Sequence, residues 1–286
     1  MNIIVIAFFV VLSLFNFNHS QKPETDNLIL NVDSGLIKLL DIRDKIKPIH
    51  PFLSHLHPVV IADKGNLYIF DFDTLTKKYR FIRKVSSPFP IPDEIRASFP
   101  LSSYENKSSC IVTLDIFNSL AGYTTIFHEF IHCTQANTIE YQIKSSLKIA
   151  QEAAEENDYS WELNHLFPYQ DSVFTDYYTS FIEAVKENDD RRIQAIRRDL
   201  KEYLNQVDFE YMVWQDWKEG FARFIENKIR RELDIEENHF GENRPYHRIT
   251  FYYGGELFIN YLIHKDEELS TNIGSLFEHM YNFGSR

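Results

Sequence analysis

Basic residues are scarce in this chain: 30 lysines and arginines stand against 42 aspartates and glutamates among 286 residues, a net charge of -12. Such a surface repels a phosphate backbone or an anionic lipid face, so nucleic acid is not an expected partner. Glycine and proline are also few, at 9 and 10 residues, while 44% of the residues are hydrophobic. We find no internal repeat and no low-complexity segment. The composition predicts a globular protein with a sizeable core, built as one large domain or two closely packed layers.

Cysteine is the rarest residue type, with only Cys110 and Cys133, so the chain can form at most one disulfide. In an exported protein that bond would join the strand expected just before residue 120 to the helix expected after it. Two separately buried thiols are the alternative. The sequence leaves both arrangements open.

Residues 3–15, IIVIAFFVVLSLF, form a long apolar run, and polar residues follow it up to a candidate cleavage site near Ser20. This pattern predicts a signal peptide over residues 1–20 and an exported protein, either periplasmic or secreted. No lysine or arginine precedes the run, and Asn18 and Ser20 match a cleavage site only loosely. An uncleaved N-terminal anchor, which would bring the protein to a membrane, and a buried N-terminal element therefore stay open.

The sequence from residue 21 to residue 119 combines one helical pattern with several strand-like runs. Residues 35–46, GLIKLLDIRDKI, predict a helix capped by Asp33 or Ser34, and the proline-rich residues 86–94 predict a loop. We expect a small twisted sheet with one or two helices in this N-terminal α/β subdomain. The expected strands are PVVIA, NLYIFDF, YRFIRKV and CIVTLDIF.

From residue 120 onward, hydrophobic residues recur at helical spacing. We therefore predict a helical subdomain over residues 120–286, packed against the small sheet of residues 21–119, and an α+β fold class. The helical segments include IEYQIKSSLKIAQEAAEE, SVFTDYYTSFIEAVKE, IQAIRRDLKEYL and WQDWKEGFARFIENKIRREL.

Residues 124–135, TTIFHEFIHCTQ, contain two histidines four positions apart around a glutamate. On a helix, His128 and His132 lie on one face with Cβ atoms about 5 to 6 Å apart, and can bind one zinc ion. Glu129 lies one step round the helix, where it can take a proton from water at the metal. Burying two imidazoles and a carboxylate among bulky apolar residues costs free energy of desolvation, and a bound cation would offset that cost. A satisfied pair of core histidines is the alternative.

A catalytic zinc site needs a third protein ligand. The residues after His132, CTQANT, contain neither the glycine nor the third histidine of metzincins, which excludes that class. Further on, residues 217–226 read WKEGFARFIE. This segment and HEFIH together resemble the gluzincin metallopeptidases, whose aminopeptidase-like members have HExxH followed by WxNEGFAxxxE. The resemblance implies that Glu219 is the third zinc ligand, with Glu226 and Glu162 as alternatives.

The match departs from the gluzincin pattern at two positions and in spacing. Asp216 stands where the family has tryptophan, and Lys218 replaces its asparagine. Glu219 also follows the HEFIH motif at a much longer distance than the short gap typical of the family. The resemblance therefore implies a zincin-like fold with a long helical insertion between about Ile139 and Leu204.

Residues 251–262, FYYGGELFINYL, resemble the YxxGxxxxxYL segment that follows the ligand helix in this family. Tyr252 falls on the tyrosine that stabilises the oxyanion. An ordinary core tyrosine is the alternative, in which case His247 is the next donor to examine. The GxMEN motif, by which aminopeptidase members bind the amino terminus of a substrate, is absent before His128. Exopeptidase specificity therefore does not follow from the resemblance.

These features predict a zinc-dependent metallopeptidase with His128, His132 and Glu219 as metal ligands, Glu129 as general base and Tyr252 at the oxyanion. The expected substrate is a peptide or protein held in extended form beside the strand CIVTLDIF. A zinc-dependent hydrolase of a non-peptide amide or ester, and a non-catalytic zinc-binding module, are the alternatives. An intact Glu129 argues against the binding module, because a closed structural site has no use for a base.

Overall fold

The computed structural model describes residues 21–158 and 160–284. The predicted signal peptide or anchor, residues 1–20, lies outside the described residues. Within them, no helix is both long enough and apolar enough to cross a membrane. This part of the chain has one five-stranded mixed sheet and ten α-helices, which confirms the predicted α+β class.

The sheet strands fall in the first half of the described chain and most helices in the second. The first half contains α1 (Gln21–Ile46), η1 (Pro51–Ser54), β1 (Val59–Asp63), β2 (Asn66–Asp73), β3 (Lys78–Ser86), β4 (Arg96–Leu101), β5 (Lys107–Val112) and η2 (Leu114–Asn118), where η denotes a 3₁₀ helix. The second half contains α2 (Leu120–Thr138), α3 (Glu140–Ser146), α4 (Lys148–Glu156), α5 (Trp161–Asn164), α6 (Ser172–Lys186), α7 (Asp190–Tyr203), α8 (Gln206–Glu232), α9 (Thr250–Lys265), η3 (Glu267–Ser270) and α10 (Ile273–Asn282).

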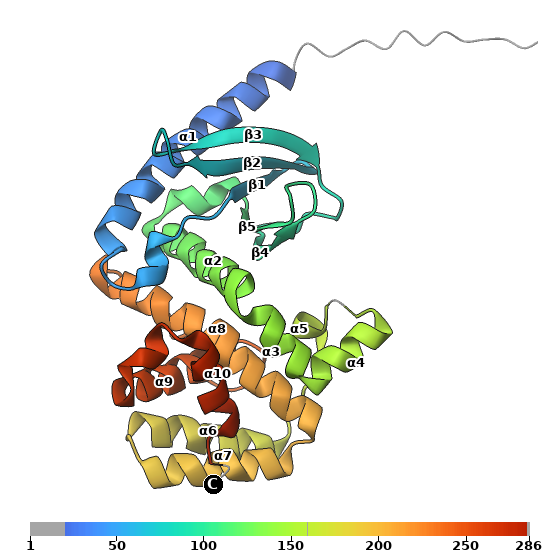
Figure 1. The fold of residues 1–286 in the computed structure, drawn as a ribbon, viewed down its shortest axis with the longest axis vertical. Helices are drawn as coiled ribbons and strands as arrows, with labels where there is room; N and C mark the ends of the chain where they lie inside the picture. Colours follow the sequence, from blue (N-terminus) through green and yellow to red (C-terminus); the bar gives the residue numbers. More distant parts are fainter. Residues whose placement is uncertain (1–20, 159, 285–286) are drawn as a thin grey trace, which may run out of the picture.

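The sheet lies near one end of the molecule, with its strands in the order β3-β2-β1-β5-β4 (Figure 1). β1 and β5 are parallel, and the other neighbouring strands are antiparallel. Successive side chains of a strand point to opposite faces. Val59 and Ile61 of β1 therefore join the main core, which includes residues of α1 and α2, while Val60 and Ala62 join a smaller cluster on the other face.

Helix α1 begins earlier than the sequence predicts. Asp33 and Ser34, the expected caps, lie inside the helix, which starts at Gln21. The helix continues upstream of them because Leu28 and Val32 pack against the main core, which extends the apolar face by more than a turn. Tertiary packing therefore overrides the local capping signal.

The expected strand CIVTLDIF is shorter than predicted. β5 ends at Val112, and the chain turns into η2, where Asp115 forms an ion pair with Arg96 of β4. The sequence does not predict β4, because strands tolerate a proline such as Pro100 mainly at a sheet edge. β4 is that edge: among the described strands it pairs with β5 alone, and β5 lies inside the sheet.

The two cysteines do not form the disulfide considered from the sequence. Cys110 lies in β5 and Cys133 in α2, and both are free and fully buried. Burial raises the pKa of both thiols well above the usual value, so they stay protonated and unreactive. Two buried thiols are therefore the arrangement found.

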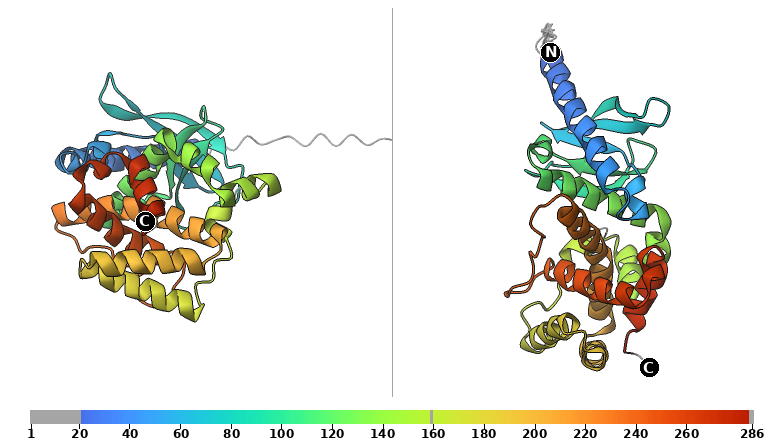
Figure 2. Two further views of the ribbon diagram at one scale, coloured as in Figure 1. Left: turned by 60° about the horizontal axis from the view of Figure 1, so that its bottom comes forward. Right: turned by 90° about the vertical axis from the view of Figure 1, so that its left-hand side faces the viewer.

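Helices α2 and α8 cross the middle of the molecule, with the sheet on one side and α6 and α7 at the opposite end (Figures 1 and 2). α2 contacts β4 and β5 as well as α8. The 27-residue α8 begins after Asn205, whose side chain accepts a hydrogen bond from the Asp208 amide, and has Arg230 and Arg231 in its last turn. Both ends suit the helix dipole. Helices α3 to α7 lie between α2 and α8 along the chain.

Helices α8 and α9 pack closely at two glycines. A Cβ atom at Gly220 would lie 2.6 Å from the carbonyl carbon of Gly255, and one at Gly255 would lie 2.2 Å from the carbonyl oxygen of Asp216. Any larger residue would push the helices apart, because both distances are shorter than atomic contact allows. The glycine of EGFA thus brings α9, with Tyr252, against the part of α8 that contains Glu219.

Candidate metal centre

Helix α2 carries the HEFIH residues through the centre of the protein. Its N-cap, Ser119, accepts a hydrogen bond from the amide of Gly122. Glu129 is its only acidic or basic residue besides the histidines, and residues 126–135 are all buried. A helix that is apolar nearly all round belongs in a core, so the polar side chains that it buries need partners there.

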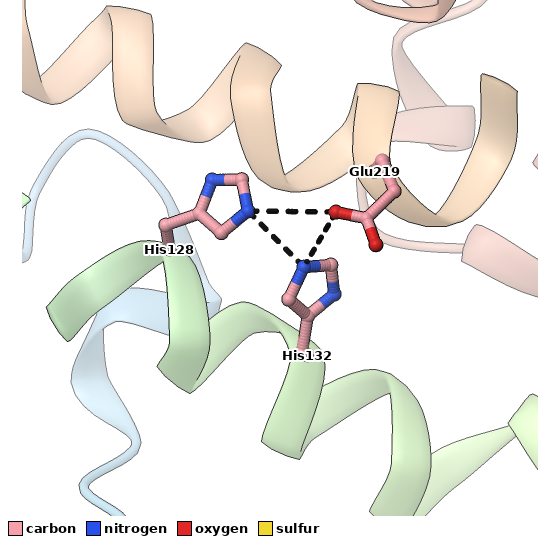
Figure 3. A group of neighbouring side chains, drawn as sticks. All are labelled: His128, His132 and Glu219. Carbon is pink, nitrogen blue, oxygen red and sulfur yellow. Dashed lines mark hydrogen bonds and ion pairs between the residues drawn. The ribbon is translucent and has the colours of Figure 1, made fainter. Parts of the chain in front are cut away.

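His128, His132 and Glu219 meet where α2 contacts α8 (Figure 3). The Nε2 atoms of the two histidines are 3.1 Å apart. Oε2 of Glu219 is 3.1 Å from Nε2 of His132 and 3.7 Å from Nε2 of His128. A tetrahedral zinc ion with bonds of about 2.0 to 2.1 Å places its ligand atoms about 3.3 Å apart. The spacing of these three atoms therefore fits three ligands of one such ion.

The Nδ1 atoms of both histidines face acceptors on the other side of each ring. Nδ1 of His128 is 3.1 Å from Oε2 of Glu226, and Nδ1 of His132 is 2.8 Å from Oε1 of Gln135. Acceptors there favour the tautomer with its proton on Nδ1, which leaves the Nε2 lone pairs for a metal. Glu226, an alternative ligand in the sequence, is therefore placed behind His128 and outside the cluster of possible ligands.

Glu226 is itself held by several donors. Its Oε1 accepts hydrogen bonds from Nε of Arg230 at 2.8 Å and from the amide of Asn238 at 3.1 Å. Nε of Arg223 lies 3.2 Å from its Oε2. These contacts fix the carboxylate that orients His128, because each oxygen is tied to a residue of α8 or of the segment that follows it.

The carboxylates around the histidines favour a positive charge at the cluster. Burial lowers the pKa of His128, but hydrogen bonds to Glu219 and Glu226 outweigh burial and raise that pKa to about 9. Burial raises the pKa of Glu219, but the two histidines outweigh it and hold that pKa well below its usual range. At neutral pH the cluster therefore holds a proton unless a metal cation displaces it.

A cleft of about 590 Å³ opens over the cluster. Residues 96–99 of the edge strand β4 line it, together with residues of α2, α5, α8 and α9. Glu129 also lines the cleft, beside His128 and His132, and is 7% exposed. Its carboxylate forms no hydrogen bond with any other described residue. Glu129 is therefore placed to act on a molecule in the cleft without binding the metal.

Tyr252 lines the cleft, with its ring stacked on that of His128 at a centroid distance of 6.3 Å. Burial, followed by the charge of Glu219, raises the pKa of Tyr252 well above its usual value, so the hydroxyl stays protonated. That hydroxyl accepts a 2.7 Å hydrogen bond from Arg248. His247, the alternative donor, is exposed and is not among the residues that line the cleft.

Ion pairs occupy the two positions that depart from the gluzincin pattern. Asp216 lies 3.1 Å from Arg197, and both side chains are fully buried. Lys218 lies 2.7 Å from Glu162 and 3.3 Å from Glu140. These pairs attach α8 to α7, α5 and α3. Glu162, the second alternative ligand, is thereby held by lysine outside the His128, His132 and Glu219 cluster.

Sequence reasoning missed three parts of this site: Gln135, Arg248 and strand β4. Gln135 follows His132 by one helical turn, and Arg248 precedes Tyr252 by four residues. Helical spacing from His132 could have identified Gln135, whereas Arg248 lies just before α9, so helical spacing does not point to it. β4 gives no comparable signal, because its pairing with β5 is a long-range contact.

Comparisons of the chain with protein-family models, with curated proteins and with solved structures gave no match. The resemblance to gluzincins therefore rests on the motifs alone.

Proposed function

We propose that the protein is a zinc-dependent metallopeptidase that hydrolyses peptide bonds. The observation that carries the proposal is the meeting of His128, His132 and Glu219 at zinc-ligand spacing in an open cleft. Two imidazoles and one carboxylate are the ligand set of a catalytic zinc site that keeps one position open. A closed structural site would use four protein ligands and would leave Glu129 without a role.

Zinc in this cluster would supply an acidified water molecule and a polarised substrate carbonyl. The Glu129 carboxylate accepts a proton from the attacking water and passes it to the leaving amine. Tyr252, kept protonated, donates a hydrogen bond to the oxygen on which negative charge develops. Glu226 and Gln135 hold the two imidazole rings in the orientation that a metal needs.

The edge strand β4 supports an extended polypeptide as the substrate. The expectation that substrate pairs with the strand CIVTLDIF is wrong, because β5 already has a partner strand on each side and no free edge. β4 has β5 as its only partner among the described strands, and its residues 96–99 line the cleft. An extended peptide can add to such an edge through backbone hydrogen bonds. A small amide or ester would make no use of it, which favours a peptidase.

Metal analysis followed by a protease assay tests the proposal. We expect the purified protein to contain about one zinc ion per chain and to cleave an unfolded substrate protein. A chelator should stop cleavage, and added zinc should restore it. His132→Ala is the matched control and should lack both zinc and activity. A wild-type protein without zinc, or cleavage that the chelator leaves unchanged, would contradict the proposal.

Tyr252→Phe is expected to lower turnover by roughly 10²- to 10³-fold, because the loss of one oxyanion donor acts mainly on the transition state. Zinc content and substrate affinity should barely change, since the phenyl ring can still stack on His128. Tyr253→Phe is the control, because the Tyr253 hydroxyl donates to Glu242 outside the cleft. Steady-state kinetics of both variants make the comparison. Wild-type turnover in Tyr252→Phe would remove Tyr252 from the mechanism.

A further inference from the structure

Four basic side chains line the cleft, and three of them lie beside carboxylates that do not belong to the metal cluster. The three pairings are Arg96 with Asp115, Lys218 with Glu140 and Glu162, and Arg223 with Glu226. Arg248 is the fourth, and the carboxylate near it is that of Glu219, which belongs to the metal cluster.

Arg248 precedes α9 and has few partners. Its Nη1 donates a 2.7 Å hydrogen bond to the hydroxyl of Tyr252, and lies 3.6 Å from Oε1 of Glu219. Nε and Nη2 donate no hydrogen bond to any other described residue, and 28% of the side chain is exposed. A guanidinium carries N–H donors on each of its nitrogens. Most donors of Arg248 are therefore free for a molecule in the cleft.

Among the described residues, Glu219 is the one carboxylate at ion-pair distance from Arg248, and it is also the third ligand of the candidate metal centre. A metal bound through Oε2 would reduce the negative charge that Glu219 presents to Arg248, and no other described carboxylate lies at ion-pair distance from this guanidinium. A charged group that is mostly buried needs such a partner, and the planar fork of arginine matches a carboxylate with two parallel hydrogen bonds.

We infer that the cleft recognises a carboxylate of the substrate and that Arg248 binds it. The inference rests on the proposed function, because it names the class of peptide that the same site would take. Arg248 lies 3.6 Å from a candidate metal ligand, so the recognised carboxylate lies about one residue from the scissile bond. It belongs either to the C-terminus of the peptide or to an aspartate or glutamate side chain, and both present the same group to the guanidinium.

Matched peptides test the inference and separate the two sources. Cleavage sites in an unfolded protein are first mapped by mass spectrometry, and peptides around them are made with a free or amidated C-terminus and with Glu or Gln beside the scissile bond. We expect kcat/KM to favour the carboxylate member of one pair by about tenfold or more. The pair that shows the preference identifies the source, and Arg248→Gln should abolish it. Arg96→Gln, which removes the same charge from β4, should retain it.

The ratio within a pair also separates carboxylate binding from a role that only orients Tyr252. If Arg248 acts only through Tyr252, Arg248→Gln lowers kcat equally for both members of each pair. If Arg248 binds the carboxylate, the loss falls on the charged member. Equal kcat/KM for matched peptides in the wild type, or a preference that survives in Arg248→Gln, would overturn the inference.

Binding to the zinc-loaded Glu129→Gln variant gives a second measurement that needs no turnover. We expect titration calorimetry with short acetylated peptides to show binding about tenfold tighter for carboxylate than for amide forms. The difference should vanish when Arg248→Gln is added to that variant. If the wild type hydrolyses no peptide, the proposed function fails, while this comparison still decides the role of Arg248. Equal binding of the charged and uncharged peptides would overturn it.

Discussion

Glu129→Gln is expected to lower peptide hydrolysis by about 10²- to 10⁴-fold while the protein keeps its zinc. The amide has nearly the same shape as the carboxylate but cannot accept a proton. Glu129 lines the cleft beside His128 and His132, yet it is not one of the clustered ligand residues. Its loss should therefore remove the base and leave the metal centre intact. Measurements of kcat/KM and of zinc content on the same preparation make the test.

Glu129→Asp is the matched variant for this experiment. It keeps a carboxylate but moves it back by one methylene group, so it should retain part of the activity that Glu129→Gln loses. Hydrolysis at the wild-type rate by zinc-loaded Glu129→Gln would show that another group is the base. Loss of zinc from that variant would instead make Glu129 a ligand.

Glu219→Gln is expected to weaken zinc binding by more than a hundredfold, and Glu226→Gln by about 10- to 100-fold. Glu219 faces the Nε2 atoms of both histidines, whereas Glu226 contacts only Nδ1 of His128. Loss of the Glu219 carboxylate removes a metal ligand. Loss of the Glu226 carboxylate leaves all three ligands in place and removes only the negative charge beside Nδ1 of His128. Competition of each variant with a chelator of known affinity measures the ranking.

Thermal unfolding of the metal-free variants serves as the control for this ranking. Glu226 also accepts hydrogen bonds from Arg230 and Asn238, so Glu226→Gln should lower stability in the absence of metal. A stability loss without any loss of zinc affinity would limit Glu226 to a structural role. The reverse ranking, with zinc held more weakly by Glu226→Gln, would make Glu226 the ligand in place of Glu219.

The sequence by itself determines the part of the site that lies on one helix. His128, Glu129 and His132 take their relative places from the geometry of α2, because residues four apart share a face whatever surrounds the helix. The uncharged residues around them likewise indicate that this helix is buried. The α+β class and most strands follow from the same kind of local periodicity.

Only the tertiary structure decides which groups meet that helix. Sequence reasoning offers Glu219, Glu226 and Glu162, and the family resemblance favours the first. In the folded chain, Glu219 faces the histidines, Glu226 lies behind one of them, and Glu162 is held by lysines. The same holds for the edge strand β4 and for Arg248, which lie far along the chain from HEFIH. Backbone geometry fixes the spacing within a helix, whereas contacts between distant segments depend on which buried surfaces and ion pairs fit together. No local pattern encodes that fit.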